Sequence, residues 1–345
     1  MMAICARTDL EKFAAEIFQA VGTPDDLAEE VAASLVLSNL LGHDSHGVLR
    51  IPSYLEHVDK GIIVPSARPV LVLDTATTAT VDGQWAFGQV TAHMATEVAI
   101  NKAREHRVAA VALTRCNHIG RLGEYTEMAA RAGMVGIMIG ATHGADSVAP
   151  YGGAARALST NPISFSVPSS EEPVVADLAT SAAAEGKLRL ARANGQQLPP
   201  GILLDKRGCP STDPDDYYAG GMLLPAGGHK GYVLGVLADL IGKYLAGADD
   251  YFTGNITWAN VLIVIKIEAF RPLREFTKRV DTRTREIKAT PPAPGFEEVM
   301  LPGEPELRTL RERTERGIPI PEGTVTALSE VARRLNVAIP ESLRR

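Results

Sequence analysis

The sequence predicts an α/β fold flanked by helical segments, and three features of its 345 residues support this. The first seventy residues place apolar side chains at helical spacing. From about residue 70, short β-branched segments alternate with helical ones, as in α/β domains. The tail from about residue 270 is charged and again helical. With 45% hydrophobic and 22% charged residues, the chain can bury a substantial core in one or two domains.

The first predicted helix is amphipathic. Leu10, Phe13 and Ile17 fall on one face, which we expect to be buried. Thr8 is positioned as the N-cap of this helix and Gly22 as its end.

A second helix is predicted to follow at once. Thr23 is positioned as its cap, Pro24 at the first helical position, and Gly42 at its end. Pro52 then favours a new helix start near Ile51.

The middle of the chain supplies the predicted sheet. Strands are expected at residues 69–74, 78–83, 108–116, 134–141, 163–169 and 260–267. Helices are expected at residues 89–106, 123–133 and 231–248. Residues 186–228 are rich in Gly, Pro, Asp and Arg, so we expect mostly loops there.

Composition excludes several classes of protein. The net charge of -6 and the pI of about 5.8, without a dense Lys/Arg run, argue against a nucleic-acid binder and favour a small-molecule partner. Cys5, Cys116 and Cys209 are too far apart for a C-x-x-C pair, and no stretch of about 20 residues is apolar enough for a membrane span. We therefore expect a cytoplasmic protein with no membrane partner.

The sequence contains no complete copy of the common nucleotide-binding and hydrolase motifs. No G-x-G-x-x-G follows a strand in the first βαβ unit, and AAAEGKL shares only the Gly-Lys of a P-loop. The sequence also lacks H-E-x-x-H and G-x-S-x-G. What remains is a set of polar, glycine-rich segments, most of them next to predicted strands, where α/β proteins build ligand sites.

The segment HDSHGVLR contains the first candidate site residues. His46 lies beside a glycine in a helix-terminal loop and could serve as a general acid/base, or could simply cap helix carbonyls. Arg50 lies a turn away and could grip a carboxylate in bidentate fashion, or could be a solvated surface arginine. Together the two residues suit a hydroxy-acid or oxo-acid substrate.

His118 is a second histidine at the end of a predicted strand. It could act as an acid/base or be hydrogen-bonded within a turn. His43 and His46 could join it as metal ligands, but no carboxylate or thiolate stands beside them with recognisable spacing, so no metal is expected.

Three further polar residues have both functional and structural interpretations. Asp177 ends a strand, where it could bind ribose hydroxyls or cap the next segment. Lys230, flanked by glycines at a helix start, suits a phosphate or is solvated. Asn161 is expected to be extended, because Pro162 follows it, and to satisfy a turn.

Taken together, these segments resemble the malate/L-lactate dehydrogenase family of nicotinamide-dependent 2-hydroxyacid oxidoreductases, which is unrelated to the Rossmann-type lactate dehydrogenases. The segments GHDSHG, FGQV and LPGE are most similar to the hydroxycarboxylate dehydrogenase branch. The matching segments, in chain order, are GHDSHGVLRIPSY, DGQWAFGQV, NHIGRLGEY, VAPYGG, STNPISF, ADLATSAAAEGK, LPPGILLDKRGCPSTDP, GGHKGYVL, APGF, LPGEPE and RGIPI.

The resemblance implies a non-Rossmann α/β fold. In it, a helical region for substrate binding and dimerisation, residues 1–72 and 270–345, packs against a central mixed-sheet NAD(P)-binding domain, residues 73–269. It further implies a homodimer with sites near the subunit interface, and reversible hydride transfer between NAD(P)H and a small 2-oxo acid. NAD is slightly favoured over NADP, although no residue pattern marks the preference.

The resemblance also implies roles for individual residues. His46 and His118 match proton donors of different members of the family, and Arg50 matches a carboxylate-binding residue found in some branches. The residues assigned to cofactor binding are Thr142, Thr160, Asn161, Ala176, Asp177, Leu178, Ala179, Thr180, Ser181, His229, Lys230, Gly303 and Glu304. In the expected mechanism, an imidazolium protonates the alkoxide that forms as the ketone is reduced.

Two other functions stay open at this point. One is the reduction of a cyclic imine acid or a diketo acid, or chemistry on a ureido acid, at the same type of site. The other is a relative that binds the nucleotide without catalysis. The retained histidines, Arg50, Asp177 and Lys230 argue against the second.

Overall fold

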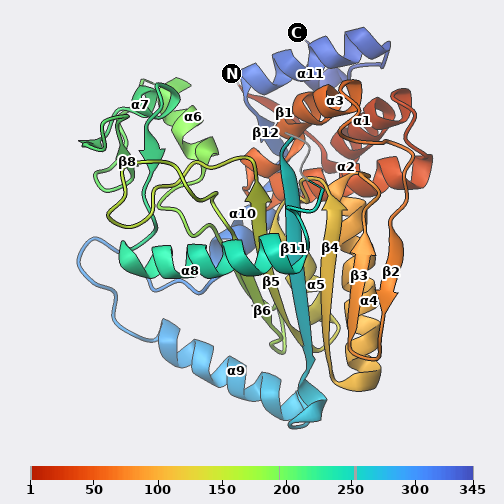
Figure 1. Cartoon of the computed structure of the whole chain (residues 1–345), viewed down its shortest axis with the longest axis vertical. Coiled ribbons are helices and arrows are strands. Elements are labelled where there is room, and N and C mark those ends of the chain that lie inside the picture. Colours follow the sequence, from red (N-terminus) through yellow and green to blue (C-terminus); the bar gives the residue numbers. More distant parts are fainter. Residues whose placement is uncertain (1, 194, 252–254, 345) are drawn as a thin grey trace.

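A seven-stranded mixed sheet forms the centre of the computed structural model, which describes residues 2–193, 195–251 and 255–344 (Figure 1). Strands β3 and β4 pair in parallel, and the other neighbours in this sheet are antiparallel. In sheet order the strands are β2 (Val70–Asp74), β3 (Thr78–Asp82), β4 (Val108–Cys116), β11 (Thr257–Lys266), β5 (Met134–His143), β6 (Ile163–Val167) and β7 (Val174–Leu178). The prediction of an α/β fold with a central mixed sheet is confirmed.

Helices cover both faces of this sheet (Figure 1). Helices α4 and α5 pack on one face, and α8 with the π-helical turn η3 crosses the other. Helix α4 approaches its strands closely because small side chains, Ala92, Ala95, Ala99 and Ala103, form its buried face. The bounds of these elements are α4 (Gly88–His106), α5 (Leu122–Arg131), α8 (His229–Asp239) and η3 (Leu240–Leu245).

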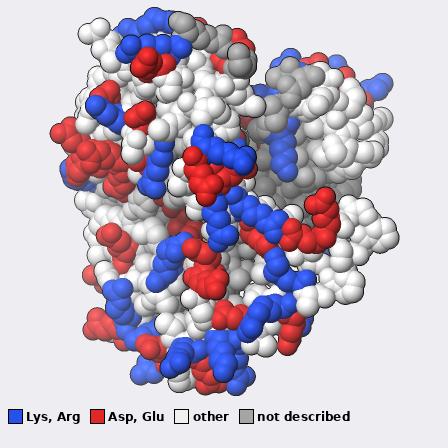
Figure 2. Space-filling view, turned by 180° about the vertical axis from the view of Figure 1, so that it is seen from behind, with Lys and Arg blue, Asp and Glu red and all other residues white. Residues whose placement is uncertain are grey.

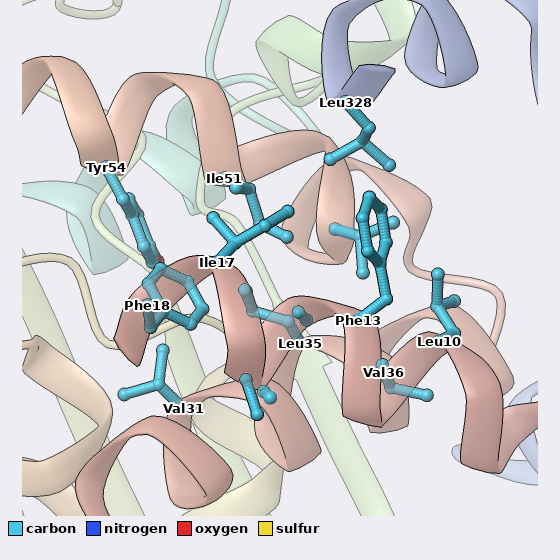
Figure 3. Close-up of a cluster of buried hydrophobic side chains, with 14 of the residues drawn as sticks. Leu10, Phe13, Ile17, Phe18, Val31, Leu35, Val36, Ile51, Tyr54 and Leu328 are labelled. Atoms are coloured by element: carbon cyan, nitrogen blue, oxygen red, sulfur yellow. The ribbon is translucent and has the colours of Figure 1, made fainter. Parts of the chain in front are cut away.

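The two ends of the chain meet in a helical layer above the sheet (Figure 1). Strand β1 pairs antiparallel with β12, and apolar side chains from α1, α2, α3 and α11 share one core (Figure 3). The predicted apolar face of the first helix, Leu10, Phe13 and Ile17, is fully buried in this core. The elements are β1 (Ala3–Cys5), α1 (Arg7–Ala20), α2 (Asp25–Leu40), α3 (Ile51–Asp59), α10 (Glu304–Arg316), β12 (Ile318–Ile320), α11 (Glu322–Leu335) and the 3-10 turn η5 (Glu341–Leu343).

Residues 186–228 are more structured than the sequence predicts. They contain most of one helix, another short helix and a small three-stranded sheet in the order β10-β8-β9, with Leu188, Leu203 and Tyr217 buried in its own apolar cluster. The sequence does not predict these strands, because two residues are too few to show the alternation of apolar and polar side chains that marks a strand. The elements are α6 (Glu185–Ala193), β8 (Leu203–Leu204), β9 (Pro210–Ser211), α7 (Pro214–Tyr218) and β10 (Met222–Leu223).

The predicted starts of the first two helices are wrong by one or two residues. Helix α1 begins at Arg7, since Ala6 leaves the β1–β12 pair in an extended conformation and takes the cap position in place of Thr8. Helix α2 has Pro24 as its cap, with ψ at 147°, because the backbone N–H of Thr23 bonds back to the end of α1. Tertiary pairing and the tight turn override the local capping signals.

The apolar segment predicted as a helix over 231–248 starts earlier and changes type. It begins at His229 and, after Asp239, continues as the π-helical turn η3. Gly242 in that turn lies against Ala141 of β5, where an added Cβ would come within 2.8 Å. Helix α9 (Leu273–Lys288), preceded by the turn η4 (Ile267–Ala269), runs past the lower end of the sheet (Figure 1).

Charge is distributed in both signs over the back of the molecule, where lysines and arginines lie among acidic residues (Figure 2). Among the described residues, none of the helices has the length and apolarity needed to cross a bilayer.

Candidate active site

His46 and His118 lie together where the helical layer meets the ends of the strands. Their rings are nearly parallel, at 21°, with centroids 5.6 Å apart. His46 is in the 3-10 turn η1 (Asp44–His46), and His118 follows β4. The fold thus brings together two of the predicted site residues from segments about seventy positions apart.

The loop that carries His46 is held from outside its own segment. Asp44 accepts hydrogen bonds from both terminal nitrogens of Arg313 in α10, at 2.7 and 3.0 Å, and from the Asn39 amide at 2.6 Å. The Asn39 Oδ1 accepts the Val48 N–H at 2.9 Å. Gly47 permits this contact, since a Cβ there would lie 2.1 Å from Asn39 Oδ1. Sequence reasoning missed Asn39 and Arg313, whose roles depend on non-local contacts.

Hydrogen bonds determine which nitrogen of His118 carries the proton. The Tyr54 hydroxyl lies 2.8 Å from His118 Nδ1, and the Gly120 backbone N–H donates to the same atom at 3.3 Å. A backbone N–H can only donate, and the Gln89 amide already donates to the Tyr54 oxygen at 3.0 Å. His118 Nδ1 is therefore an acceptor, and the hydrogen of the neutral ring is on Nε2.

Among the described residues, the His46 ring has one hydrogen bond, which is compatible with either tautomer, because a hydroxyl can donate or accept. The ring Nδ1 lies 3.0 Å from the Ser45 hydroxyl, which can accept a hydrogen from it and leave the Nε2 lone pair free. Arg50, in the turn η2 (Val48–Arg50), donates from Nε to the Ser45 carbonyl at 2.7 Å. The Arg50 side chain is thus anchored to the same loop as the histidine.

The surroundings of both histidines favour the neutral ring. Burial, together with the charges of Arg50 and two nearby cationic groups, lowers the pKa of His46 to about 3. Burial and Arg50 also hold the pKa of His118 well below its ordinary value. These surroundings penalise the charged ring. The imidazolium that protonates the alkoxide in the expected mechanism stays a prediction.

Aromatic side chains border the histidine pair. The Trp258 ring stands edge-on to His118, with centroids 5.9 Å apart, and also lies 6.2 Å from the ring of His57. Trp258 pairs across the sheet with Thr142, so the two side chains share one face. The predicted residue Thr142 is therefore next to the wall of the site.

A small cavity, which we call the Arg121 pocket, lies between the first residues of α5 and those of α10. It has a volume of about 20 Å³. Its polar lining consists of His43, Arg121, Glu127, Asp177, Gly303 and Glu306. The predicted residues Asp177 and Gly303 thus share one pocket, whereas Arg121 was passed over because its burial has no signal in the sequence.

Asp177 is fixed at the start of α5. Its Oδ2 accepts the Gly123 backbone N–H at 2.7 Å, and burial raises its pKa against the opposing effect of Arg121. His43, considered above as a metal ligand, lies 3.4 Å from Glu306 through Nε2.

The segments around Thr160 and Thr180 are joined to each other. Thr180 donates to the Thr160 carbonyl through its backbone N–H at 3.0 Å and its hydroxyl at 3.1 Å. Asn161 is fully buried, and its amide donates to the Gly235 carbonyl of α8 at 3.0 Å. Its φ of +32° contradicts the predicted extended conformation, because this tertiary hydrogen bond overrides the effect of the following proline.

The other residues assigned to cofactor binding are spread over β7 and the surface. Ala176 and Leu178 belong to edge strand β7, and Ala179 and Ser181 follow it. His229 and Lys230 are exposed at the start of α8, where the His229 ring contacts Tyr151. Glu304 pairs with Lys288 and Arg308, and despite partial burial these cations lower its pKa to about 2. In the described part of the chain, no group of three or more His, Cys, Asp or Glu could hold a metal ion.

Comparison with known proteins identifies the family. Residues 5–329 match the profile described as malate/L-lactate dehydrogenase. A malate dehydrogenase from Pyrococcus abyssi is 34% identical over 344 residues, covering 96% of this chain and 94% of the relative. A hydroxycarboxylate dehydrogenase B from Escherichia coli O157:H7 is 36% identical, with 95% and 93% covered. The solved structure of a sulfolactate dehydrogenase from Methanocaldococcus jannaschii superposes with a TM-score of 0.89 at 33% identity, covering 97% of this chain and 98% of that one.

The mixed sheet, the helical layer and these full-length matches define an NAD(P)-dependent 2-hydroxyacid dehydrogenase, an oxidoreductase that acts on a CH–OH group. The chain belongs to the malate/L-lactate dehydrogenase family, as predicted from the sequence.

Proposed function

We propose that the chain oxidises a small 2-hydroxy acid to the 2-oxo acid, and reverses this reaction, with His46 as the acid/base and Arg50 as the ligand of the substrate carboxylate. The observation that carries this assignment is the stacked pair of histidines, in which His118 presents its Nε2–H and His46 bonds the Ser45 hydroxyl through Nδ1. A free Nε2 lone pair on His46 can take a hydroxyl proton. An Nε2–H on His118 can donate a hydrogen bond to the same oxygen.

Oxidation then proceeds with a complete proton balance. His46 Nε2 takes the proton from the C2 hydroxyl, and the electron pair of that O–H bond becomes the second bond of the carbonyl. The nicotinamide, when bound, accepts the hydride from C2. His118 stabilises the developing negative charge on the oxygen through its Nε2–H. In the reverse direction, His46 returns the proton.

The substrate charge supports the protonated form that reduction needs. Arg50 lowers the proton affinity of both histidines, so a carboxylate paired with Arg50 offsets that charge. Binding of either acid therefore raises the pKa of His46 from its depressed value. A less depressed pKa lets His46 take up a proton in oxidation and release it in reduction.

The cofactor is NAD or NADP, with NAD the preferred form in this proposal. Thr142 pairs across the sheet with Trp258, whose ring contacts His118. Asp177 and Gly303 line a pocket with a buried guanidinium, Arg121, that has two nitrogens without a hydrogen-bond partner, and this lining fits a polar nucleotide group. Lys230 at the exposed start of α8 suits a cofactor phosphate.

A homodimer is the proposed assembly. Helix α8 and the turn η3 expose a continuous series of large apolar side chains, which in a soluble enzyme marks a protein interface. These side chains are Val233, Leu234, Leu237, Leu240, Tyr244 and Leu245. Sedimentation analysis of a Leu237→Glu variant would test this surface, and we expect it to shift the protein to the monomer. The free thiols of all three cysteines agree with a cytoplasmic location.

A substrate panel tests the function. NADH and NADPH oxidation is measured with pyruvate, oxaloacetate, phenylpyruvate, a diketo acid and a cyclic imine acid, and ureido-acid oxidation is run in the reverse direction. We expect turnover with at least one open-chain 2-oxo acid. Turnover with the imine or ureido acid alone would replace this substrate class. Cofactor binding without any turnover would indicate a relative that only binds nucleotide.

A further inference from the structure

The loop that carries His46 is fixed on both sides of this histidine. Two residues before it, Asp44 accepts a hydrogen bond from the side-chain amide of Asn39 at 2.6 Å. Two residues after it, the Val48 backbone N–H donates to Asn39 Oδ1 at 2.9 Å. One side chain at the end of α2 therefore holds the loop before and after the histidine.

Arg313 joins the same loop to a third segment, the helix α10. Its two terminal nitrogens donate to the two carboxylate oxygens of Asp44, at 2.7 and 3.0 Å, in the paired geometry that suits a guanidinium and a carboxylate. The guanidinium also donates to the Asn39 backbone carbonyl in the last turn of α2. With 16% of its side chain exposed, Arg313 is enclosed at the junction of α2, α10 and the loop.

One face of α10 follows the start of the loop. Positions 306, 309 and 313 are separated by three and four residues, so their side chains lie on the same side of the helix. Each contacts a different residue within 42–44. The pairs are Glu306 with His43 at 3.4 Å, Thr309 with Gly42, where a Cβ would lie 3.1 Å from the threonine methyl, and Arg313 with Asp44 at 2.7 Å.

Both proposed site side chains depend on the place of this loop. Arg50 donates from Nε to the Ser45 carbonyl at 2.7 Å, one residue before His46, so the two site residues move together. Proton transfer needs the histidine within hydrogen-bond reach of the C2 oxygen. A misplacement of about 1 Å can lower a rate by about 100-fold. An anchor of the loop therefore affects both turnover and substrate binding.

We propose that Arg313 is a positioning residue for the reaction, which sets the place of His46 and Arg50 through its paired hydrogen bonds to Asp44. Helix α10, from the C-terminal part of the chain, thus fixes an active-site loop near the N-terminus. The inference rests on the proposed function, in which His46 is the acid/base and Arg50 binds the substrate carboxylate.

Steady-state kinetics of the full chain tests this role. Arg313→Met is expected to lower kcat by about 10-fold or more, because His46 moves, and to raise the KM for the oxo acid, because Arg50 moves with it. Arg316→Met is the matched control on the same helix. Its side chain is 76% exposed and pairs only with the exposed Glu312, so it should keep wild-type kcat and KM.

Two further variants separate positioning from folding. Asp44→Asn keeps one carbonyl oxygen and loses the charge, so we expect kcat to fall by about 10-fold. Because Arg313 acts through Asp44, the double variant Arg313→Met with Asp44→Asn should be no slower than Arg313→Met alone. Arg313→Lys keeps the charge without the planar fork, and it should recover part of both kcat and KM.

The outcomes are distinguishable. Wild-type kcat and KM in Arg313→Met would overturn the proposal, and so would losses that multiply in the double variant, because Arg313 would then act independently of Asp44. A lower kcat with an unchanged KM and a lower melting temperature would show loss of folded protein alone, which also overturns it. Absence of turnover in the wild type, or full turnover in His46→Gln, would instead refute the proposed function.

Discussion

Two histidine clusters in this chain have opposite affinities for a proton. His46 and His118 stack on each other, and the pKa of each is depressed. His93, on α4, lies between Glu30 at 2.6 Å and Glu124 at 2.8 Å. Although burial opposes the charge, hydrogen bonds that the His93 ring donates to these two carboxylates raise its pKa to about 10. The surroundings favour the charged form of one imidazole and the neutral form of the other two.

The difference shows what each cluster is suited to do. A charged His93 joins α2, α4 and α5 by ion pairs, and its protonation does not change near neutral pH. The neutral pair has a cation, Arg50, as its nearby charge, so its protonation state responds to an incoming anion. Surroundings rather than residue type separate a structural histidine from a catalytic one.

The largest effect is expected from His46→Gln. The amide cannot take the hydroxyl proton, so turnover should fall by about 100-fold or more, the usual scale for losing an acid/base. Steady-state kinetics in both directions measures this. His106→Gln, which removes an exposed histidine from α4, serves as the matched control and should retain wild-type rates.

The matching change at the second histidine tests the division of roles. His118→Gln can still present an N–H to the substrate oxygen, so we expect a smaller loss, about 10-fold. Losses in the reverse order would assign the acid/base to His118.

The contrasting cluster is tested by His93→Gln. Removing the shared cation leaves Glu30 and Glu124 facing each other, and breaking a buried pair in this way costs about 3 kcal/mol of the free energy of unfolding. Urea denaturation at pH 7 measures the loss. Wild-type stability in the variant would mean that the ion pairs contribute little.

The pH dependence of stability separates the two clusters further. With a folded pKa near 10 against about 6.5 unfolded, the stabilisation from His93 is complete below pH 6.5 and is lost as the pH rises towards 10. With a folded pKa near 3, His46 acts with the opposite sign, since stability is lost as the pH falls from 6.5 towards 3. We therefore expect His93→Gln to reduce the loss of unfolding free energy at alkaline pH. His46→Gln should reduce the loss at acid pH.

The sequence could reveal the members of the neutral cluster but not the state of either cluster. His46, Arg50 and His118 stand in short local motifs next to predicted element ends, so they can be recognised from the sequence alone. The residues that set the proton affinity of the two histidines come from distant segments, so the sequence alone does not reveal them. The two carboxylates that bind His93 come from other helices and are 63 and 31 positions away in the sequence.

The same limit applies to the supports of the site. Arg313 reaches Asp44 across 269 positions, and the Tyr54 hydroxyl reaches His118 across 64. The strands of the main sheet were predictable, since runs of β-branched residues specify them locally. The burial of Arg121 was not, because a single arginine in a polar segment has the same pattern whether it is solvated or enclosed.

The smallest expected effect comes from Arg50→Leu, which changes the charge that keeps the two histidines neutral. Loss of the carboxylate ligand should raise the KM for oxo acids by about 10-fold, with a lesser change in kcat. Without the guanidinium, the pKa of His46 should also rise, so the acid limb of the kcat/KM profile should move to higher pH. Arg50→Lys restores the charge without the planar fork, and it should recover the pH profile while leaving part of the KM defect. An unchanged KM in Arg50→Leu would remove the carboxylate role, and an unmoved profile would show that burial alone keeps His46 neutral.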